Sequence, residues 1–238
     1  MEQLPGYFSS GAVTYSFPSF RDTNFVRQTI KTMKNPLASE GGLAILKGSL
    51  APDGAVIRST SASPELLTHR GKALVFENHD DMENRIDDPN LDVTPNDVLI
   101  LRDSGPVGAP GMPEWGFMPI PKKLLQKGVR DMVRLSDARM SGTAFGTVVV
   151  HITPESAIGG PLAAVRNGDI IDLDAKKGTI NVRLSKKELA KRRKKWKPKK
   201  MNFGSGTLWK YAQTVGPAYL GASTHPGKKK EVKVYADI

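Results

Sequence analysis

Two glycine-rich segments of the chain carry side chains that could do chemistry. One of them, residues 135–146, crowds hydroxyl and charged groups between two apolar runs and contains two glycines. The other, residues 105–115, is a Gly/Pro loop that presents one carboxylate, Glu114, 27 residues before Ser141. Glycine lets a backbone approach a ligand closely. A hydroxyl and a carboxylate on such loops predict a site, and they leave its kind open.

The composition excludes several kinds of site. The 238 residues contain no cysteine, so the chain can form no disulfide and supplies no thiol nucleophile and no thiolate ligand. The four histidines are scattered, so a bound metal would be a hard ion held by oxygen atoms. No apolar run approaches the roughly 20 residues of a membrane span, and the first residues lack a signal-peptide pattern. We therefore expect a cytoplasmic protein with no membrane partner.

The net charge of +11 is concentrated in one segment. Residues 186–200 contain ten Lys or Arg and one Glu, and the rest of the chain is nearly neutral. An interaction with nucleic acid would have to depend on this segment, which has Trp196 in its midst. A solvated helix followed by a lysine-rich tail is the simpler interpretation, and we favour it.

Short apolar runs between Gly, Pro and Asp turns predict a β-rich α/β domain. The expected strands are 43–47, 55–58, 72–76, 97–101, 129–135 and 147–152, with a hairpin of 169–173 and 179–184. Helical segments are expected at 25–33, 63–67, 79–86, 120–126 and 162–165, and a capping box at Ser185–Glu188 starts a basic helix that runs to about Trp196. The domain organisation is an uncertain arm over 1–34, the main domain over 35–200 and a tail over 201–238.

Other polar residues of these segments have plainer expectations. Asp137 and Arg139 should form a structural pair, and His151 should be a packed, hydrogen-bonded strand histidine. Glu155 should cap the turn that follows it. The pair Gly159–Gly160 either cradles a ligand near a helix start or forms a packing turn.

With these segments placed, the chain resembles the carboxy-terminal domain of the dihydroxy-acid dehydratase/phosphogluconate dehydratase family. The blocks follow in order over about residues 36–195, which is far more specific than a single glycine motif. The form of 136–143, Ser-Asp-Ala-Arg-Met-Ser-Gly-Thr, is similar to that of the sugar-acid dehydratases. The resemblance implies a swivelling β/β/α fold, a partly open barrel with flanking helices. The matching blocks are Gly41–Ile57, Gly105–Glu114, Ser136–Gly142, His151–Pro161 and Gly168–Asp174.

The resemblance also implies a reaction, the removal of water from a 2,3-dihydroxy acid to give a 2-keto-3-deoxy acid. Ser141 matches the family's base, Glu114 matches a magnesium ligand, and Thr143 matches a hydroxyl near the substrate. In the family an iron–sulfur cluster acts on the departing 3-hydroxyl, and Mg²⁺ binds the carboxylate end and activates the serine. A divalent cation lowers the pKa of a bound oxygen acid by many units and stabilises the developing charge. The plain alternatives are a tight-turn serine and a solvated carboxylate at a helix start.

The family's cluster cysteines and its remaining magnesium ligands lie in an amino-terminal domain that does not match this chain. We therefore expect half a site, an inactive isolated chain, and completion by a cluster-bearing N-terminal dehydratase domain. The expected ligand is a small hydroxy acid, and the complete enzyme is expected to be a homo-oligomer. The alternative is a non-catalytic binding module that uses the basic 186–200 segment on nucleic acid or another polyanion.

Overall fold

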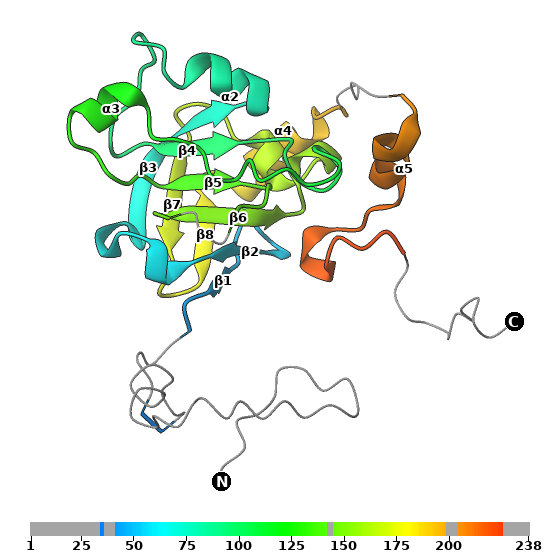
Figure 1. Ribbon diagram of the computed structural model, residues 1–238, viewed down its shortest axis with the longest axis horizontal. Helices are drawn as coiled ribbons and strands as arrows, with labels where there is room; N and C mark the ends of the chain where they lie inside the picture. Colours follow the sequence, from blue (N-terminus) through cyan, green and yellow to red (C-terminus); the bar gives the residue numbers. More distant parts are fainter. Residues whose placement is uncertain (1–33, 36–40, 142–144, 199–203, 226–238) are drawn as a thin grey trace, which may run out of the picture. The chain divides into compact units, whose positions relative to one another are not determined.

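The computed structural model describes residues 34–35, 41–141, 145–198 and 204–225. Residues Gly42–Ile238 belong to one compact unit and Met1–Gly41 to another. The described strands form one eight-stranded mixed sheet in the order β1-β2-β6-β5-β4-β3-β7-β8 (Figure 1). These strands are β1 Ala44–Leu46, β2 Gly54–Ile57, β3 Thr68–Phe76, β4 Val98–Leu101, β5 Arg134–Ser136, β6 Val148–Thr153, β7 Ile170–Asp174 and β8 Thr179–Val182.

The sheet has a parallel centre and antiparallel ends that almost meet. Strands β3, β4, β5 and β6 are parallel neighbours, while β1–β2, β2–β6, β3–β7 and β7–β8 pair antiparallel. Lys47, just after β1, bridges to Thr179 of β8. Its N–H donates to the Gly178 carbonyl at 2.9 Å, and its carbonyl accepts from the Ile180 N–H at 3.0 Å. The sheet is therefore a nearly closed barrel, which confirms the predicted β-rich α/β fold.

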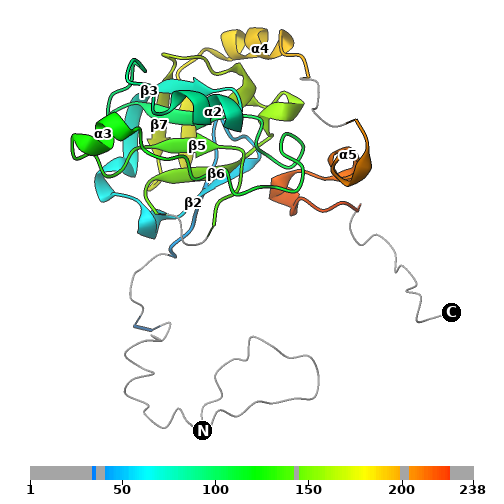
Figure 2. The ribbon, with the colours of Figure 1, turned by 45° about the horizontal axis from the view of Figure 1, so that its top comes forward.

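The parallel strands are apolar on both faces because each face is covered. In β3 and β4, Val75 and Ile100 belong to the cluster inside the barrel, whereas Phe76 and Leu101 belong to a second cluster outside it. Helices α2 (His79–Arg85) and α3 (Lys122–Gln126) contribute Met82 and Leu124 to the outer cluster. Figures 1 and 2 show both helices beside β3 and β4, with α4 (Lys186–Lys194) apart from them. Continuous apolar runs are what such doubly covered parallel strands require.

Local signals in the sequence explain the ends of several helices. The Ser185 side chain accepts a hydrogen bond from the Glu188 N–H at 3.1 Å, so the predicted cap of α4 is confirmed. Asn78 caps α2 in the same way through the Asp81 N–H at 2.8 Å. A further helix, α5 (Gly206–Thr214), lies in the segment expected only as a tail. Among the described helices, none has the length and apolar character needed to cross a bilayer.

Three predicted elements differ from the structure, and one cannot be compared. The expected helical segment 63–67 is a 3₁₀ turn, Pro64–Leu66. The expected strand 129–135 is only the short β5. Just before it, the Met132 and Thr147 N–H groups donate to the Asp131 carboxylate instead of to the carbonyl of a neighbouring strand. The expected helix 162–165 is a 3₁₀ turn, Pro161–Ala164. The expected helix 25–33 lies outside the described residues.

Arg134 at the start of β5 carries a buried charge, since its side chain is only 1% exposed. Its guanidinium binds groups from several segments of the chain. Its guanidinium donates to the Asp131 carboxylate at 3.0 Å, to the Met118 carbonyl at 2.9 Å and to the Phe145 carbonyl at 3.1 Å. It also lies 4.9 Å from the centre of the Phe117 ring, in a cation–π contact. This network fixes Phe145, the residue at which the described chain resumes after 142–144.

Candidate active site

Polar residues follow the carboxyl ends of all four parallel strands. Glu77 follows β3, Arg102–Ser104 follow β4, Asp137 follows β5, and Pro154–Ser156 follow β6. Neighbouring parallel strands end at the same edge of a sheet, and ligands of open α/β sheets bind there. The two predicted functional loops, which carry Glu114 and Ser141, leave from this edge because they follow β4 and β5.

Arg139 and Gly116 hold the two predicted loops against each other. The Gly116 N–H donates to the Arg139 carbonyl at 2.8 Å. The Arg139 side chain donates to the Met112 carbonyl at 2.5 Å and lies 3.2 Å from a carboxylate oxygen of Glu114. A Cβ at Gly116 would lie 2.7 Å from the Arg139 carbonyl oxygen, so only glycine permits this approach. The structure therefore places Glu114 on the loop adjoining the one that contains Ser141.

The predicted site residues differ in how far the structure describes them. The Glu114 side chain is 47% exposed and lines a cavity of about 360 Å³. The rings of His79 and Trp115, which also line this cavity, stack with their centres 4.3 Å apart. Ser141 is partly buried and is the last described residue before 142–144, so Thr143 lies outside the described residues.

The donor atoms of these loops fit one cofactor of the family and not the other. An accessible carboxylate at the rim of a cavity suits Mg²⁺, which commonly takes only one or two protein carboxylates. Glu114 meets that requirement, with Arg139 as the cation that neutralises it here. An iron–sulfur cluster needs thiolates, and the chain has no cysteine. This chain therefore holds no thiolate for such a cluster.

A buried carboxylate, Asp137, fastens the loop after β4 to the turn after β6. One of its oxygens accepts from the Ser104 N–H at 3.0 Å, and the other accepts from the Ser156 N–H at 2.8 Å and the Ser156 hydroxyl at 2.5 Å. The same hydroxyl lies 2.9 Å from a carboxylate oxygen of Asp103. Burial raises the pKa of Asp137, against the hydrogen bonds from Ser156 and Ser104. Asp137 thus sets the start of the loop that carries Glu114.

Glu155 holds the same loop a few residues further on. Its carboxylate accepts from the Val107 N–H at 2.9 Å and from the Gly108 N–H at 3.1 Å. A Cβ at Gly105 would come within 2.4 Å of a Glu155 oxygen, so the loop passes directly over the carboxylate. Burial raises the pKa of Glu155 to about 7, and the Asp137 carboxylate pushes it in the same direction. The loop is therefore held by a group that changes charge near neutral pH.

The raised pKa of Glu155 predicts a pH-dependent stability. Unfolded, this carboxyl ionises near its ordinary pKa of 4.5, whereas folded it keeps its proton to about pH 7. The free energy of unfolding should therefore fall as the pH rises through this window, by about 3 kcal/mol at 1.36 kcal/mol per unit. Urea denaturation at pH 5 and pH 8 measures the fall, and the neutral isostere Glu155→Gln should remove that part of it. Parallel stability–pH curves for the two proteins would contradict the assignment.

Two carboxylates, Asp137 and Glu155, bind other partners than the sequence predicts. The expected pair of Asp137 with Arg139 is wrong, because Asp137 binds Ser156 and Ser104 while Arg139 binds Glu114. The expected cap by Glu155 is also wrong, since its side chain makes no cap bond and reaches back to the Val107 loop instead. Both carboxylates bind groups far away in the sequence, which local patterns do not reveal.

The structure gives packing roles to the pair Gly159–Gly160 and to His151. The pair Gly159–Gly160 forms a packing turn, with Trp196 against Gly159 and the Pro154 carbonyl against Gly160. His151 lies in β6 and its N–H donates to the Ala138 carbonyl at 3.0 Å. Burial, followed by the positive charge of Arg139, lowers the pKa of His151. A histidine that resists protonation is consistent with the packed role expected for it.

The basic segment packs partly against the domain. Arg192 pairs with Asp169 at 2.5 Å and with Glu188 at 2.9 Å, and Arg193 donates to the Gly159 carbonyl at 3.1 Å. At least these two cations are therefore partly occupied by the chain itself.

Sequence reasoning missed that Glu155 and Asp137 hold the loop after β4. The signal that could have found them is position, because Asp137 and Glu155 lie within two residues after the strands β5 and β6. Charged side chains at that point either bind a ligand or organise the loops that do.

The family follows from comparison with known sequences. A family model described as the C-terminal part of dihydroxy-acid/6-phosphogluconate dehydratases matches residues 28–222. The chain belongs to this dehydratase family. The matched range includes the loops that carry Glu114 and Ser141 and the segments of Asp137 and Glu155.

Individual dehydratases match the chain at high identity. The chain is 54% identical to the 6-deoxy-6-sulfo-D-gluconate dehydratase of Pseudomonas putida, over 81% of this chain and 34% of the relative. It is 52% identical to the dihydroxy-acid dehydratase of Pelagibacter ubique, over 89% and 36%. It is 47% identical to the L-arabinonate dehydratase of Rhizobium leguminosarum bv. trifolii, over 84% and 34%. The chain thus spans about a third of the length of these curated relatives.

Proposed function

We propose that this chain supplies the catalytic base and one magnesium ligand of a dehydratase that converts a 2,3-dihydroxy acid to a 2-keto-3-deoxy acid. The observation that carries the proposal is the joining of two loops at one edge of the sheet by Arg139 and Gly116, which brings the segments of Glu114 and Ser141 together. Two of the relatives described above are named for sugar acids. A sugar acid is therefore the first substrate class to test, and a branched-chain dihydroxy acid is the second.

The chemistry assigns one proton transfer to this chain. As an alkoxide, the Ser141 oxygen would take the proton from C2 of the substrate while the C3 hydroxyl leaves as hydroxide. The hydroxide takes up one proton to become water, so no net proton is gained or lost, and the resulting enol becomes the 2-keto acid. A serine hydroxyl at neutral pH is a poor base, and a bound Mg²⁺ supplies the charge that lowers its pKa and stabilises the enolate-like product. Glu114 would supply one carboxylate ligand to that ion, and Arg139 lies 3.2 Å from this carboxylate and holds it in place.

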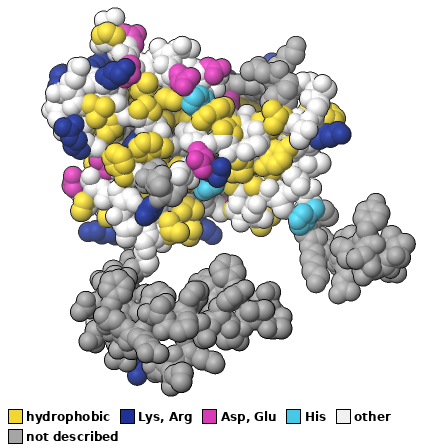
Figure 3. Space-filling view, in the orientation of Figure 1, with side chains coloured by type: hydrophobic (Ala, Val, Ile, Leu, Met, Phe, Trp, Pro, Cys, Tyr) yellow, Lys and Arg dark blue, Asp and Glu magenta, His cyan; other side chains and the backbone are white. Residues whose placement is uncertain are grey.

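The remaining parts of the site would come from a cluster-bearing dehydratase domain. The exposed large apolar side chains of the described surface include Phe145 (61% exposed), Ile158 (50%) and Leu208 (48%). Leu208 of α5 lies against Gly111 in the loop of Glu114, at 3.7 Å from the position of a Cβ there. In Figure 3, apolar side chains occupy much of the middle of the visible face, with charged ones scattered among and around them. Exposed apolar surface is typical of interaction sites and supports the docking of such a domain here.

Reconstitution tests the proposal. The chain alone, supplied with iron and magnesium, should not release a 2-keto-3-deoxy acid from sugar acids or from a branched-chain dihydroxy acid. The same chain joined to the amino-terminal two thirds of a related dehydratase should do so. Turnover by the chain alone would overturn the claim that the site is shared. A joined protein that carries its cluster and magnesium yet remains inactive on all substrates would overturn the function itself.

Replacing Glu114 with glutamine should raise the magnesium requirement of the joined enzyme. The amide keeps the shape but loses the charge, and changes around a metal site cost about 10- to 100-fold in metal affinity. The measurement is the Mg²⁺ concentration that gives half-maximal turnover. Glu65→Gln is the matched control, because Glu65 is exposed in a turn away from this loop. An unchanged magnesium requirement would remove Glu114 from the ligand set.

A further inference from the structure

A second cavity of about 420 Å³ lies near the same edge of the sheet and shares no lining residue with the cavity beside Glu114. Its wall is formed by the ends of β3 and β4, by α2, by the turn 163–167 and by α4. A volume of this size suits a small metabolite. Trp196 and Ala163–Val165 give one part of the wall an apolar character, and charged side chains provide the rest.

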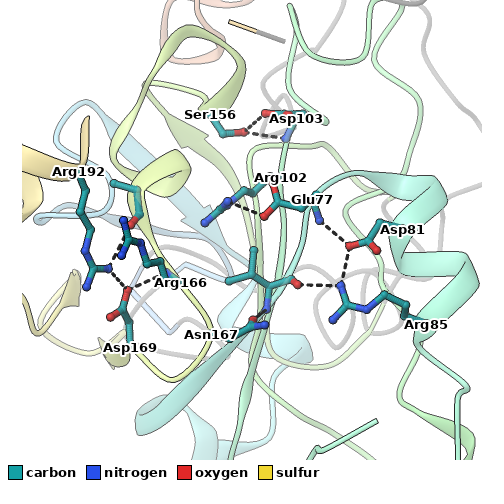
Figure 4. Close-up of polar contacts among 12 residues, drawn as sticks. Glu77, Asp81, Arg85, Arg102, Asp103, Ser156, Arg166, Asn167, Asp169 and Arg192 are labelled. Atoms are coloured by element: carbon teal, nitrogen blue, oxygen red, sulfur yellow. Dashed lines mark hydrogen bonds and ion pairs between the residues drawn. The ribbon is translucent and has the colours of Figure 1, made fainter. Parts of the chain in front are cut away.

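The charged part of the wall is predominantly cationic. Four arginines line the cavity, and Figure 4 shows that they come from four different segments. Lys195 adds a fifth cation, and Glu77 is the single carboxylate among the lining residues. The four arginines are Arg85, Arg102, Arg166 and Arg192.

Ion pairs within the chain account for only some of these cations. Arg85 pairs with Asp81 at 2.7 Å and Arg102 with Glu77 at 2.9 Å. Arg192 pairs with Asp169 at 2.5 Å, as Figure 4 shows. Within the part of the chain that the structure describes, no acidic partner lies within ion-pair distance of Arg166 or Lys195. The cavity therefore keeps a positive charge after its internal pairs are formed.

Arg102 gives an independent sign of a missing ligand. It is only 8% exposed, and its Nε–H has no hydrogen-bond partner among the described residues. A buried N–H without an acceptor costs free energy, and native proteins rarely leave one unpaired. Arginine presents its N–H groups in a planar fork that matches the oxygens of phosphate and related anions. An acceptor from outside the chain is the simplest way to satisfy this group.

We propose that this cavity binds the phosphate or sulfonate group of a small metabolite, with Arg102, Arg166 and Lys195 around the anion. The tetrahedral oxyanion would accept from the Arg102 Nε–H, which has no acceptor among the described residues, and would offset the charges of Arg166 and Lys195. The cavity is larger than a bare ion requires, and Trp196 with the neighbouring alanines provides an apolar wall for the carbon part of the ligand. The inference is independent of the dehydratase reaction, because it uses neither Glu114 nor Ser141.

Calorimetric titration of the whole 238-residue chain at constant ionic strength tests the site. The probes are inorganic phosphate, glycerol 3-phosphate as a phosphate monoester, and ethanesulfonate. One molecule of an organic probe should bind per chain, at least 10-fold more tightly than inorganic phosphate, and the stronger organic probe identifies the headgroup. Equal binding of inorganic phosphate would overturn the role of the apolar wall. Absence of binding by all three probes would overturn the site.

Variants locate the binding. Arg166→Gln and Lys195→Gln should each weaken binding by 10-fold or more without loss of fold, because neither side chain has an ion partner among the described residues. Arg102→Gln should weaken it further if the variant folds. The matched control is Arg130→Gln, an exposed arginine beyond α3 that lines neither cavity. Binding that survives in the Arg166→Gln/Lys195→Gln double variant would place the anion elsewhere and overturn the proposal.

Discussion

Replacing Ser141 with alanine should lower the turnover of the joined enzyme by about 10²- to 10⁴-fold, the usual contribution of a positioned general base. The loss should be in kcat, with KM nearly unchanged, because the hydroxyl acts on the C2 proton and not on the groups that hold the substrate. The same variant should also stop the exchange of the C2 hydrogen with deuterated solvent. That second measurement reports the proton transfer without the later departure of water.

The control for this variant is Ser205→Ala. Ser205 is an exposed serine at the start of α5 whose side chain makes no capping hydrogen bond. It should leave both turnover and hydrogen exchange unchanged. If the Ser141 variant kept more than a tenth of the original rate, the base would have to be another group.

Replacing Arg134 with methionine should lower the free energy of unfolding by about 3–5 kcal/mol. Loss of one partner of a buried ion pair leaves the other charge uncompensated, and such changes are strongly destabilising. Asp131 would keep the hydrogen bonds from Thr147 and Ser63 that, against its burial, lower its pKa. It would remain ionised in the core without its cation. Urea denaturation would measure the loss. The slope of the unfolding free energy against urea concentration should be the same for the variant and the original protein.

Arg130→Met is the matched substitution at the surface. Arg130 is exposed and makes only a 3.4 Å contact with the Leu125 carbonyl, so its replacement should change stability by no more than about 0.5 kcal/mol. A loss below 1 kcal/mol for Arg134→Met would show that the network around β5 is not held by this charge. The Asp131→Asn/Arg134→Met double variant should recover part of the loss, since it removes the stranded charge as well.

The fold was largely predictable because most of its strands are short apolar runs bounded by turn residues, which a local stretch of sequence shows. The run that became β4 is apolar throughout, and β3 ends and β6 begins in an apolar run, as is typical of parallel strands covered on both faces. The hairpin of β7 and β8 and the cap of α4 follow from turn and capping residues that act within a few positions. The segment before β5 was mistaken for a strand because its apolar residues resemble one. Its backbone is in fact bound by the side chain of Asp131.

The sequence predicted which two loops form the candidate site. It did not predict which side chains hold these loops in place. Ser141 and Glu114 stand in recognisable motifs, and Arg139 was noted among the polar residues of its loop. Its partner was misjudged because an ion pair over 25 positions depends on how two loops approach. The bond of Glu155 to Val107 spans 48 positions. Such pairs become visible only when the strand ends are known to share one edge.

The bridge between Lys47 and Thr179 has a consequence for association between molecules. An open sheet presents unpaired N–H and carbonyl groups at its outermost strands, and these are templates for aggregation. Here the two outermost strands, β1 and β8, come together at the bridge, where the N–H and carbonyl of Lys47 are both satisfied by the β7–β8 hairpin. We therefore expect copies of this domain to resist strand-to-strand polymerisation, and any self-association to proceed through side-chain surfaces instead.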